Sequence, residues 1–145
     1  MKEQILGDTT ISWYNEEETI LSVQHIEKWE GEDNLETAQE VLKGIQAYMG
    51  TGELKGLLII APSLYKKKEI LDKYQKTDVN EVARALLISS FAAKVVGNMY
   101  LRIAKGKTNE KGRYVPTKLF TEKEKAVQWL KEKLEAYQNN KDMPQ

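Results

Sequence analysis

The stretch from residue 83 to residue 130 constrains the fold of this chain more than any other part of the sequence. An apolar run at 85–89 is followed by an apolar stripe at helical spacing over 90–105. A polar loop, a second strand pattern at 114–120 and a capping-box sequence that opens at Thr121 come next. This alternation of strand and helix predicts a sheet with helices packed on it.

The first half of the chain extends the same pattern towards the N-terminus. Two strand-like segments, 9–15 and 19–26, are separated by a polar break and predict an N-terminal hairpin. A helical stripe over 35–49 ends at Gly50, and an apolar strand pattern at 57–60 follows it. With a short charged helix from Ser63, the order becomes β-β-α-β-α-β-α-β-α. Because crossovers are right-handed, we expect the later strands to be largely parallel.

The chain is long enough for one domain with a substantial core. It has 145 residues, a hydrophobic fraction of 41% and a charged fraction of 30%, which are typical of a globular protein. We therefore expect a single domain over 1–145, with an ordered core at about 9–137 and a disordered tail at 139–145.

Charge and cysteine content exclude several classes of function. Lys plus Arg and Asp plus Glu are both 22, so the basic excess of a general nucleic-acid binder is missing. The absence of cysteine rules out disulfides, thiolate catalysis and iron–sulfur clusters. No apolar run approaches the roughly 18 residues that span a bilayer, and no signal-peptide core follows Met1. These features predict a cytoplasmic protein with no integral membrane segment.

The second half of the chain also carries a family resemblance. Residues 85–100 read Ala-Leu-Leu-Ile-Ser-Ser-Phe-Ala-Ala-Lys-Val-Val-Gly-Asn-Met-Tyr, and the strand at 115–120 contains Pro116 and ends in Phe120. Together with the element order, this pattern resembles STAS-like domains of the SpoIIAA-like group, small bacterial proteins akin to anti-sigma-factor antagonists. The resemblance covers about 9–137. It implies an α/β fold in which an N-terminal β-hairpin leads into a five-stranded mixed sheet with about four helices, and a non-enzymatic regulatory function.

One segment departs from that family. Phosphorylatable STAS domains carry an Asp-Ser-(Ser/Thr)-Gly-like segment where the third strand meets its helix, whereas this chain reads Ile-Ala-Pro-Ser-Leu-Tyr at 60–65. Ser63 is thus the single candidate for a switch or contact position. A plain helix N-cap is the favoured reading, and we predict that Ser63 is not a regulatory phosphosite.

Other residues with chemical potential have a structural interpretation. His25 is the only histidine, lies in a strand segment, and has no triad partner nearby in the sequence. Trp13, Trp29 and Trp129 are expected in the core or at the rim of a contact surface. The polar segment 105–112, with two glycines, predicts a mobile and dispensable surface loop. We therefore predict no catalytic, metal-binding or cofactor-binding residues.

Two functions remain open from the sequence. The first is a non-enzymatic regulatory or binding module of STAS-like type, which engages an unknown protein partner or a small ligand. A homodimer is compatible with this function. The alternative is a carrier of a lipid or other apolar ligand, in a pocket between sheet and helices. An enzyme built from scattered carboxylates with Lys or Tyr is the least favoured reading.

Overall fold

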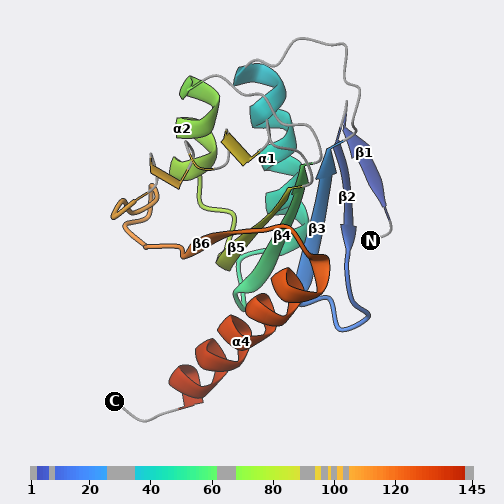
Figure 1. Ribbon diagram of the computed structural model, residues 1–145, viewed down its shortest axis with the longest axis vertical. Helices are drawn as coiled ribbons and strands as arrows, with labels where there is room; N and C mark the ends of the chain where they lie inside the picture. Colours follow the sequence, from blue (N-terminus) through green and yellow to red (C-terminus); the bar gives the residue numbers. More distant parts are fainter. Residues whose placement is uncertain are drawn as a thin grey trace.

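A computed structural model of the chain describes residues 3–6, 9–25, 35–61, 68–88, 94–95, 98, 101–102 and 105–142. Its elements form three layers, with a six-stranded sheet between helices on both faces (Figure 1). In chain order they are β1 (Gln4–Leu6), β2 (Thr9–Trp13), β3 (Ile20–His25), α1 (Leu35–Met49), β4 (Lys55–Ala61), α2 (Lys68–Lys76), β5 (Glu81–Ile88), β6 (Thr117–Phe120) and α4 (Lys123–Asp142).

The strands lie in the sheet in the order of the sequence, from β1 to β6. The first three pair antiparallel, and β3, β4, β5 and β6 pair parallel. Both the predicted hairpin and the predicted parallel strands are therefore confirmed. The hairpin turn is closed by Asn15, whose Oδ1 accepts the N–H groups of Thr19 and Ile20 at 3.0 and 3.2 Å.

The prediction of a five-stranded sheet is wrong, because β1 adds a sixth strand. A three-residue strand carries too little pattern to be recognised in a sequence. Its Leu6 packs against the core below α1, where Gly44 makes room. A Cβ atom at Gly44 would lie only 2.6 Å from Cδ1 of Leu6.

The helices differ from expectation mainly in their bounds. The structure gives bounds for three, α1, α2 and α4. The expected helix at 90–105 is described only at 94–95, 98 and 101–102, where the chain is helical. Helix α4 continues to Asp142, so residues 139–142 of the expected tail are helical. None of the helices described in full is long and apolar enough to cross a bilayer.

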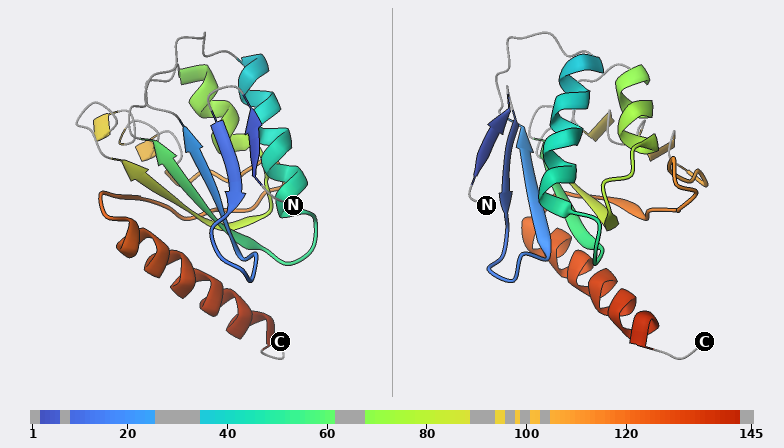
Figure 2. Two further views of the ribbon diagram at one scale, coloured as in Figure 1. Left: turned by 90° about the vertical axis from the view of Figure 1, so that its right-hand side faces the viewer. Right: turned by 180° about the vertical axis from the view of Figure 1, so that it is seen from behind.

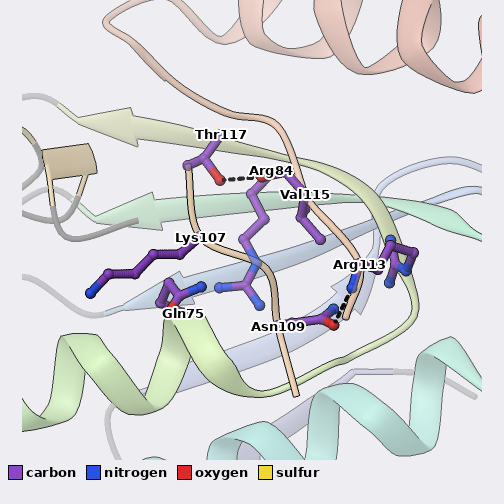
Figure 3. A pocket seen from close by; sticks show the side chains of 7 residues that line it. All are labelled: Gln75, Arg84, Lys107, Asn109, Arg113, Val115 and Thr117. Atoms are coloured by element: carbon purple, nitrogen blue, oxygen red, sulfur yellow. Dashed lines mark hydrogen bonds between the residues drawn. The ribbon is translucent and has the colours of Figure 1, made fainter. Parts of the chain in front are cut away.

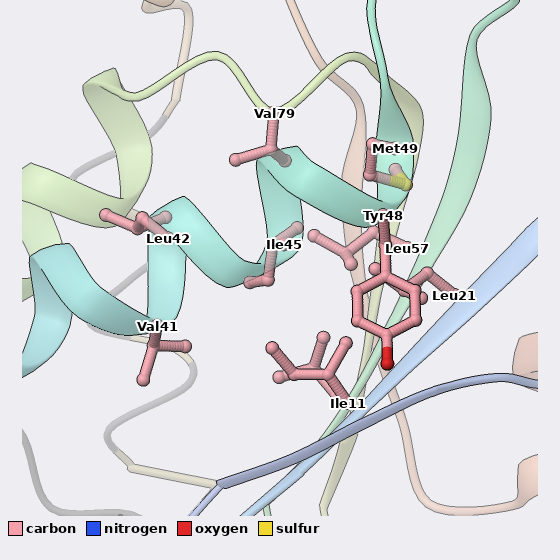
Figure 4. Close-up of a cluster of buried hydrophobic side chains, with 10 residues drawn as sticks. Ile11, Leu21, Val41, Leu42, Ile45, Tyr48, Met49, Leu57 and Val79 are labelled. Atoms are coloured by element: carbon pink, nitrogen blue, oxygen red, sulfur yellow. The ribbon is translucent and has the colours of Figure 1, made fainter. Parts of the chain in front are cut away.

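Two apolar cores cover opposite faces of the sheet, because successive strand side chains point in opposite directions. Leu21 and Leu57 belong to the core below α1, and Ile20 and Leu58 to the core below α4. Figure 4 shows the first core, in which side chains of α1 point at strands β2, β3 and β4. In the left view of Figure 2, α1 and α2 lie on one side of the sheet and α4 on the other.

Candidate functional site

The residues that the sequence singled out do not form one site. Ser63 and Trp29 lie outside the described residues. His25 is the last residue of β3, paired with Thr9 of β2. Trp13 packs against the α1 core, and Trp129 against the α4 core beside Phe120.

The structure reveals instead a buried ionic cluster at the amino end of β5. Arg84, 3% exposed, lies below the end of α2. Its guanidinium donates hydrogen bonds to the carbonyl oxygens of Tyr74 at 2.7 Å and Thr77 at 3.2 Å. It also lies 3.4 Å from the carboxylate of fully buried Glu81. A cation is favourable near a helix C-terminus, so this cluster fixes the end of α2 against β5.

Asp78 connects the cluster to the loop before β6. Its Oδ1 accepts from Arg113 at 2.9 Å and from the N–H of Asn80 at 2.6 Å. The Asp78 N–H donates to Oε1 of Glu110, and its carbonyl accepts from Nε2 of Gln46 on α1. Three segments far apart in the sequence, α1, the turn at 78–80 and the loop at 110–113, thus meet at this one residue.

The electrostatics of Asp78 follow from these contacts. Burial disfavours its charged form, but the Asn80 hydrogen bond and the Arg113 charge outweigh burial and lower the pKa of the carboxyl below its usual value. Arg113 also donates to the carbonyl of Glu81 and lies 3.9 Å from the Glu81 carboxylate. The cations and anions of the cluster therefore neutralise one another within the protein.

The sequence predicts a mobile, dispensable loop over 105–112, and the contacts of its second half argue against that prediction. Asn109 is buried, and its Oδ1 accepts the N–H groups of Lys111 and Arg113. The N–H of Glu110 donates to the carbonyl of Lys76 at 2.7 Å. Asn109 is the only buried residue of the segment 105–112, and the hydrogen bonds of residues 109–113 fix the second half of the loop in place.

The cavity at this cluster is too small for a substrate. It is lined by residues of α2, β5 and the 105–117 segment (Figure 3). Its volume is about 10 Å³. That is the volume that one water needs. The arrangement therefore suits a clasp that holds α2, β5 and the loop together.

The second half of α4 runs beyond the sheet, on the side opposite α1 and α2 (Figure 2). A larger hollow is lined in part by this half of the helix. We call it the α4 groove. It has a volume of about 600 Å³ and is open to solvent. It lies between the β2–β3 turn, the start of β4 and α4, and its lining residues are Asn15, Glu17, Glu18, Thr19, Glu53, Leu54, Lys55, Lys131, Leu134, Glu135 and Gln138.

The α4 groove has an apolar floor and a charged rim. Leu54 and Leu134 are half-buried, whereas Glu17, Glu18 and Glu135 are exposed. Sequence reasoning missed this site because its residues come from three segments, each of which looks like an ordinary polar turn or helix face. The nearest sequence signal is the Glu-Glu-Glu run at 16–18.

A second, shallower groove of about 370 Å³ lies beside edge strand β6. Phe120 and Trp129 line it with their ring centroids 5.6 Å apart. Lys118 and Lys133 lie over these two rings at 5.4 and 5.6 Å from the centroids. The aromatic surface is thus partly covered by the chain's own lysines, which leaves the α4 groove as the better candidate site.

No group of three or more His, Asp or Glu side chains within the described parts of the chain is placed to hold a metal ion. The lining of the α4 groove offers charge and apolar contact as its means of recognition.

Comparison with known proteins gives one match. The family model described as a domain of unknown function, DUF7793, matches residues 14–134. No curated protein and no solved structure matches the chain. The matched residues include both the ionic cluster and most of the α4 groove.

Proposed function

The chain belongs to the DUF7793 family, and we propose that it is a non-enzymatic regulatory or binding module of STAS-like type that engages a partner protein. The observation that carries this proposal is the α4 groove, with its apolar floor and charged rim. Half-exposed apolar side chains surrounded by polar ones are typical of protein contact surfaces. The antiparallel hairpin that leads into parallel strands is compatible with the STAS-like part of the proposal.

The position of α4 supports this reading. The first half of the helix packs on the sheet through Ala126, Val127 and Leu130. The second half runs beyond the sheet (Figure 2), and its Leu134 lines the groove. Leu134 also packs at the edge of the α4 core, so the helix presents this contact face without any change of fold.

An apolar-ligand carrier has less support. Two packed cores fill the space between the sheet and the helices α1 and α4. An apolar ligand in the α4 groove would meet charged groups such as Glu18 and Lys131 at the rim, and an unpaired charge against apolar matter is costly. A partner protein can place its own polar groups against the charged side chains of the rim.

Site-specific cross-linking tests the proposal. A photo-reactive residue at Gln138, in the groove, is compared with one at Gln39, on the exposed side of α1, in the organism's own cells. We expect a protein that is captured from Gln138 and not from Gln39. The purified pair is then measured with Leu134→Gln and with Tyr114→Gln, a control at an exposed aromatic residue away from the groove.

Loss of affinity by tenfold or more with Leu134→Gln alone supports a protein-binding module. Equal capture from both positions, or equal affinity of both variants, contradicts it. Native mass spectrometry of the protein from the same cells adds a further arm. A stoichiometric apolar molecule without any captured protein would favour the carrier, and capture of a second copy of the chain would identify a homodimer.

A further inference from the structure

We propose that the segment bound in the α4 groove is a basic one, with lysine or arginine side chains beside apolar ones. This inference rests on the proposed function and adds the chemistry of the partner. The groove combines an apolar floor with an excess of carboxylates at its rim, and these two features specify different parts of the same ligand.

The charge excess is local. Four carboxylates line the groove, against the two lysines Lys55 and Lys131. Glu16 is also exposed in the same turn. The chain as a whole has a formal charge of zero, so the acidic character belongs to this region. A surface of one sign attracts a segment of the other sign and repels its own.

Lys55 keeps its charge, but its ammonium is held by carbonyl groups of the chain itself, so it is less available to pair with the side-chain carboxylates. Its Nζ donates to the carbonyl oxygens of Met49 at 3.0 Å and Glu53 at 3.2 Å. That position holds the start of β4 against the end of α1. Lys131 is the remaining cation of the lining, and it is exposed.

The acidic turn is held in a fixed shape before any partner arrives. Asn15 accepts from the N–H groups of Thr19 and Ile20, and its Nδ2 donates to Oγ1 of Thr19 at 2.6 Å. Glu18 has a positive φ of 55°, which directs the chain back into β3. The backbone of a preformed turn loses little conformational freedom when a partner binds to it.

A basic side chain fits both parts of the groove. The aliphatic stem of a lysine or arginine packs on apolar surface while its charged end stays near water. Leu54 and Leu134 provide that surface, and Glu17, Glu18 and Glu135 lie at its edge. A wholly apolar segment, or one with acidic side chains beside apolar ones, could pack on Leu54 and Leu134 but could not pair with the carboxylates at the rim.

Two synthetic peptides test this inference directly. The first is a labelled twelve-residue peptide with alternating pairs of lysine and leucine, and the second has glutamate in place of lysine. Binding of each is measured by fluorescence anisotropy to wild type, to Glu17→Lys/Glu135→Lys and to the control Glu40→Lys/Glu69→Lys. Both double variants change the net charge equally, and all four glutamates are exposed. Thermal melts confirm that each variant is folded.

We expect the lysine peptide to bind wild type and the control, and to bind the groove variant about tenfold more weakly. This difference should shrink in 0.5 M salt, because salt screens exposed charges. Equal weakening by both variants would show attraction to net charge alone and would overturn the inference, as would equal binding of the glutamate peptide or no binding at all. If cross-linking at Gln138 nevertheless captures a partner, the proposed function stands and only the basic chemistry fails.

Discussion

Arg113 and Asp78, 35 residues apart in the sequence, form an ion pair of 2.9 Å that fastens the loop before β6 to the turn before β5. The Asp78 side chain is 5% exposed and that of Arg113 is 29% exposed. Because the pair is largely shielded from water, breaking it should destabilise the fold more than breaking a surface salt bridge.

Replacing Arg113 by methionine should destabilise the fold by about 2 kcal/mol or more, because the buried Asp78 carboxylate loses its hydrogen-bonded cation and Glu81 loses the second of its two nearby cations. The matched control is Lys111→Met, since Lys111 lies 3.8 Å from Asp78 but is 68% exposed. That variant should change the free energy of unfolding by less than about 1 kcal/mol. Urea unfolding measures both, and equal values would mean that the Arg113 pair is an ordinary surface contact.

Stability should also depend on pH through Asp78. Its pKa is lower in the folded chain than in the unfolded one, so its charged form stabilises the fold above the unfolded pKa of about 3.9. This contribution is lost as the pH falls below that value through the folded pKa. Wild type should therefore lose more stability between pH 5 and pH 2.5 than Asp78→Asn. Parallel curves for the two proteins would contradict the role of Asp78.

Arg84 should be the most sensitive residue of the cluster. Arg84→Met removes the donor to two carbonyl groups and leaves Glu81 buried without its adjacent cation. We expect a loss of about 3–5 kcal/mol. The double variant Arg84→Met/Glu81→Leu should recover part of this loss, because replacing both partners removes the buried charge. A double-mutant cycle from chemical unfolding tests the coupling, and strictly additive effects would show that the two side chains act independently.

The loop before β6 should divide into two parts with different tolerance. Replacing residues 105–108 by Gly-Ser-Gly-Ser should leave the melting temperature within about 2 °C of wild type, since these side chains are exposed. Replacing residues 109–113 by glycine and serine should lower it by more than about 5 °C, because the side chains of Glu110 and Arg113 contact Asp78 and the Asn109 side chain holds the loop closed. Equal tolerance of both replacements would restore the idea of a dispensable loop.

Local patterns in the sequence determined most of the architecture. Apolar spacing in 35–49 and the positive-φ Gly50 fix α1 and its end. The run at 57–60 fixes β4, and right-handed crossovers make the following strands parallel. These features depend on neighbouring residues and on general rules of chain geometry, so they can be predicted from the sequence alone.

Tertiary structure alone decided the ionic cluster and the site. Glu81 and Arg84 do not look like residues of a buried strand, because burying a charge is unfavourable until its partner is in place. Their partners come from α2 and, through Arg113, from a loop about 30 residues later in the chain. The α4 groove likewise exists only where the turn at 15–19, the start of β4 and the end of α4 meet in space. Contacts between segments so far apart leave no periodic pattern in the sequence, so only the folded structure shows them.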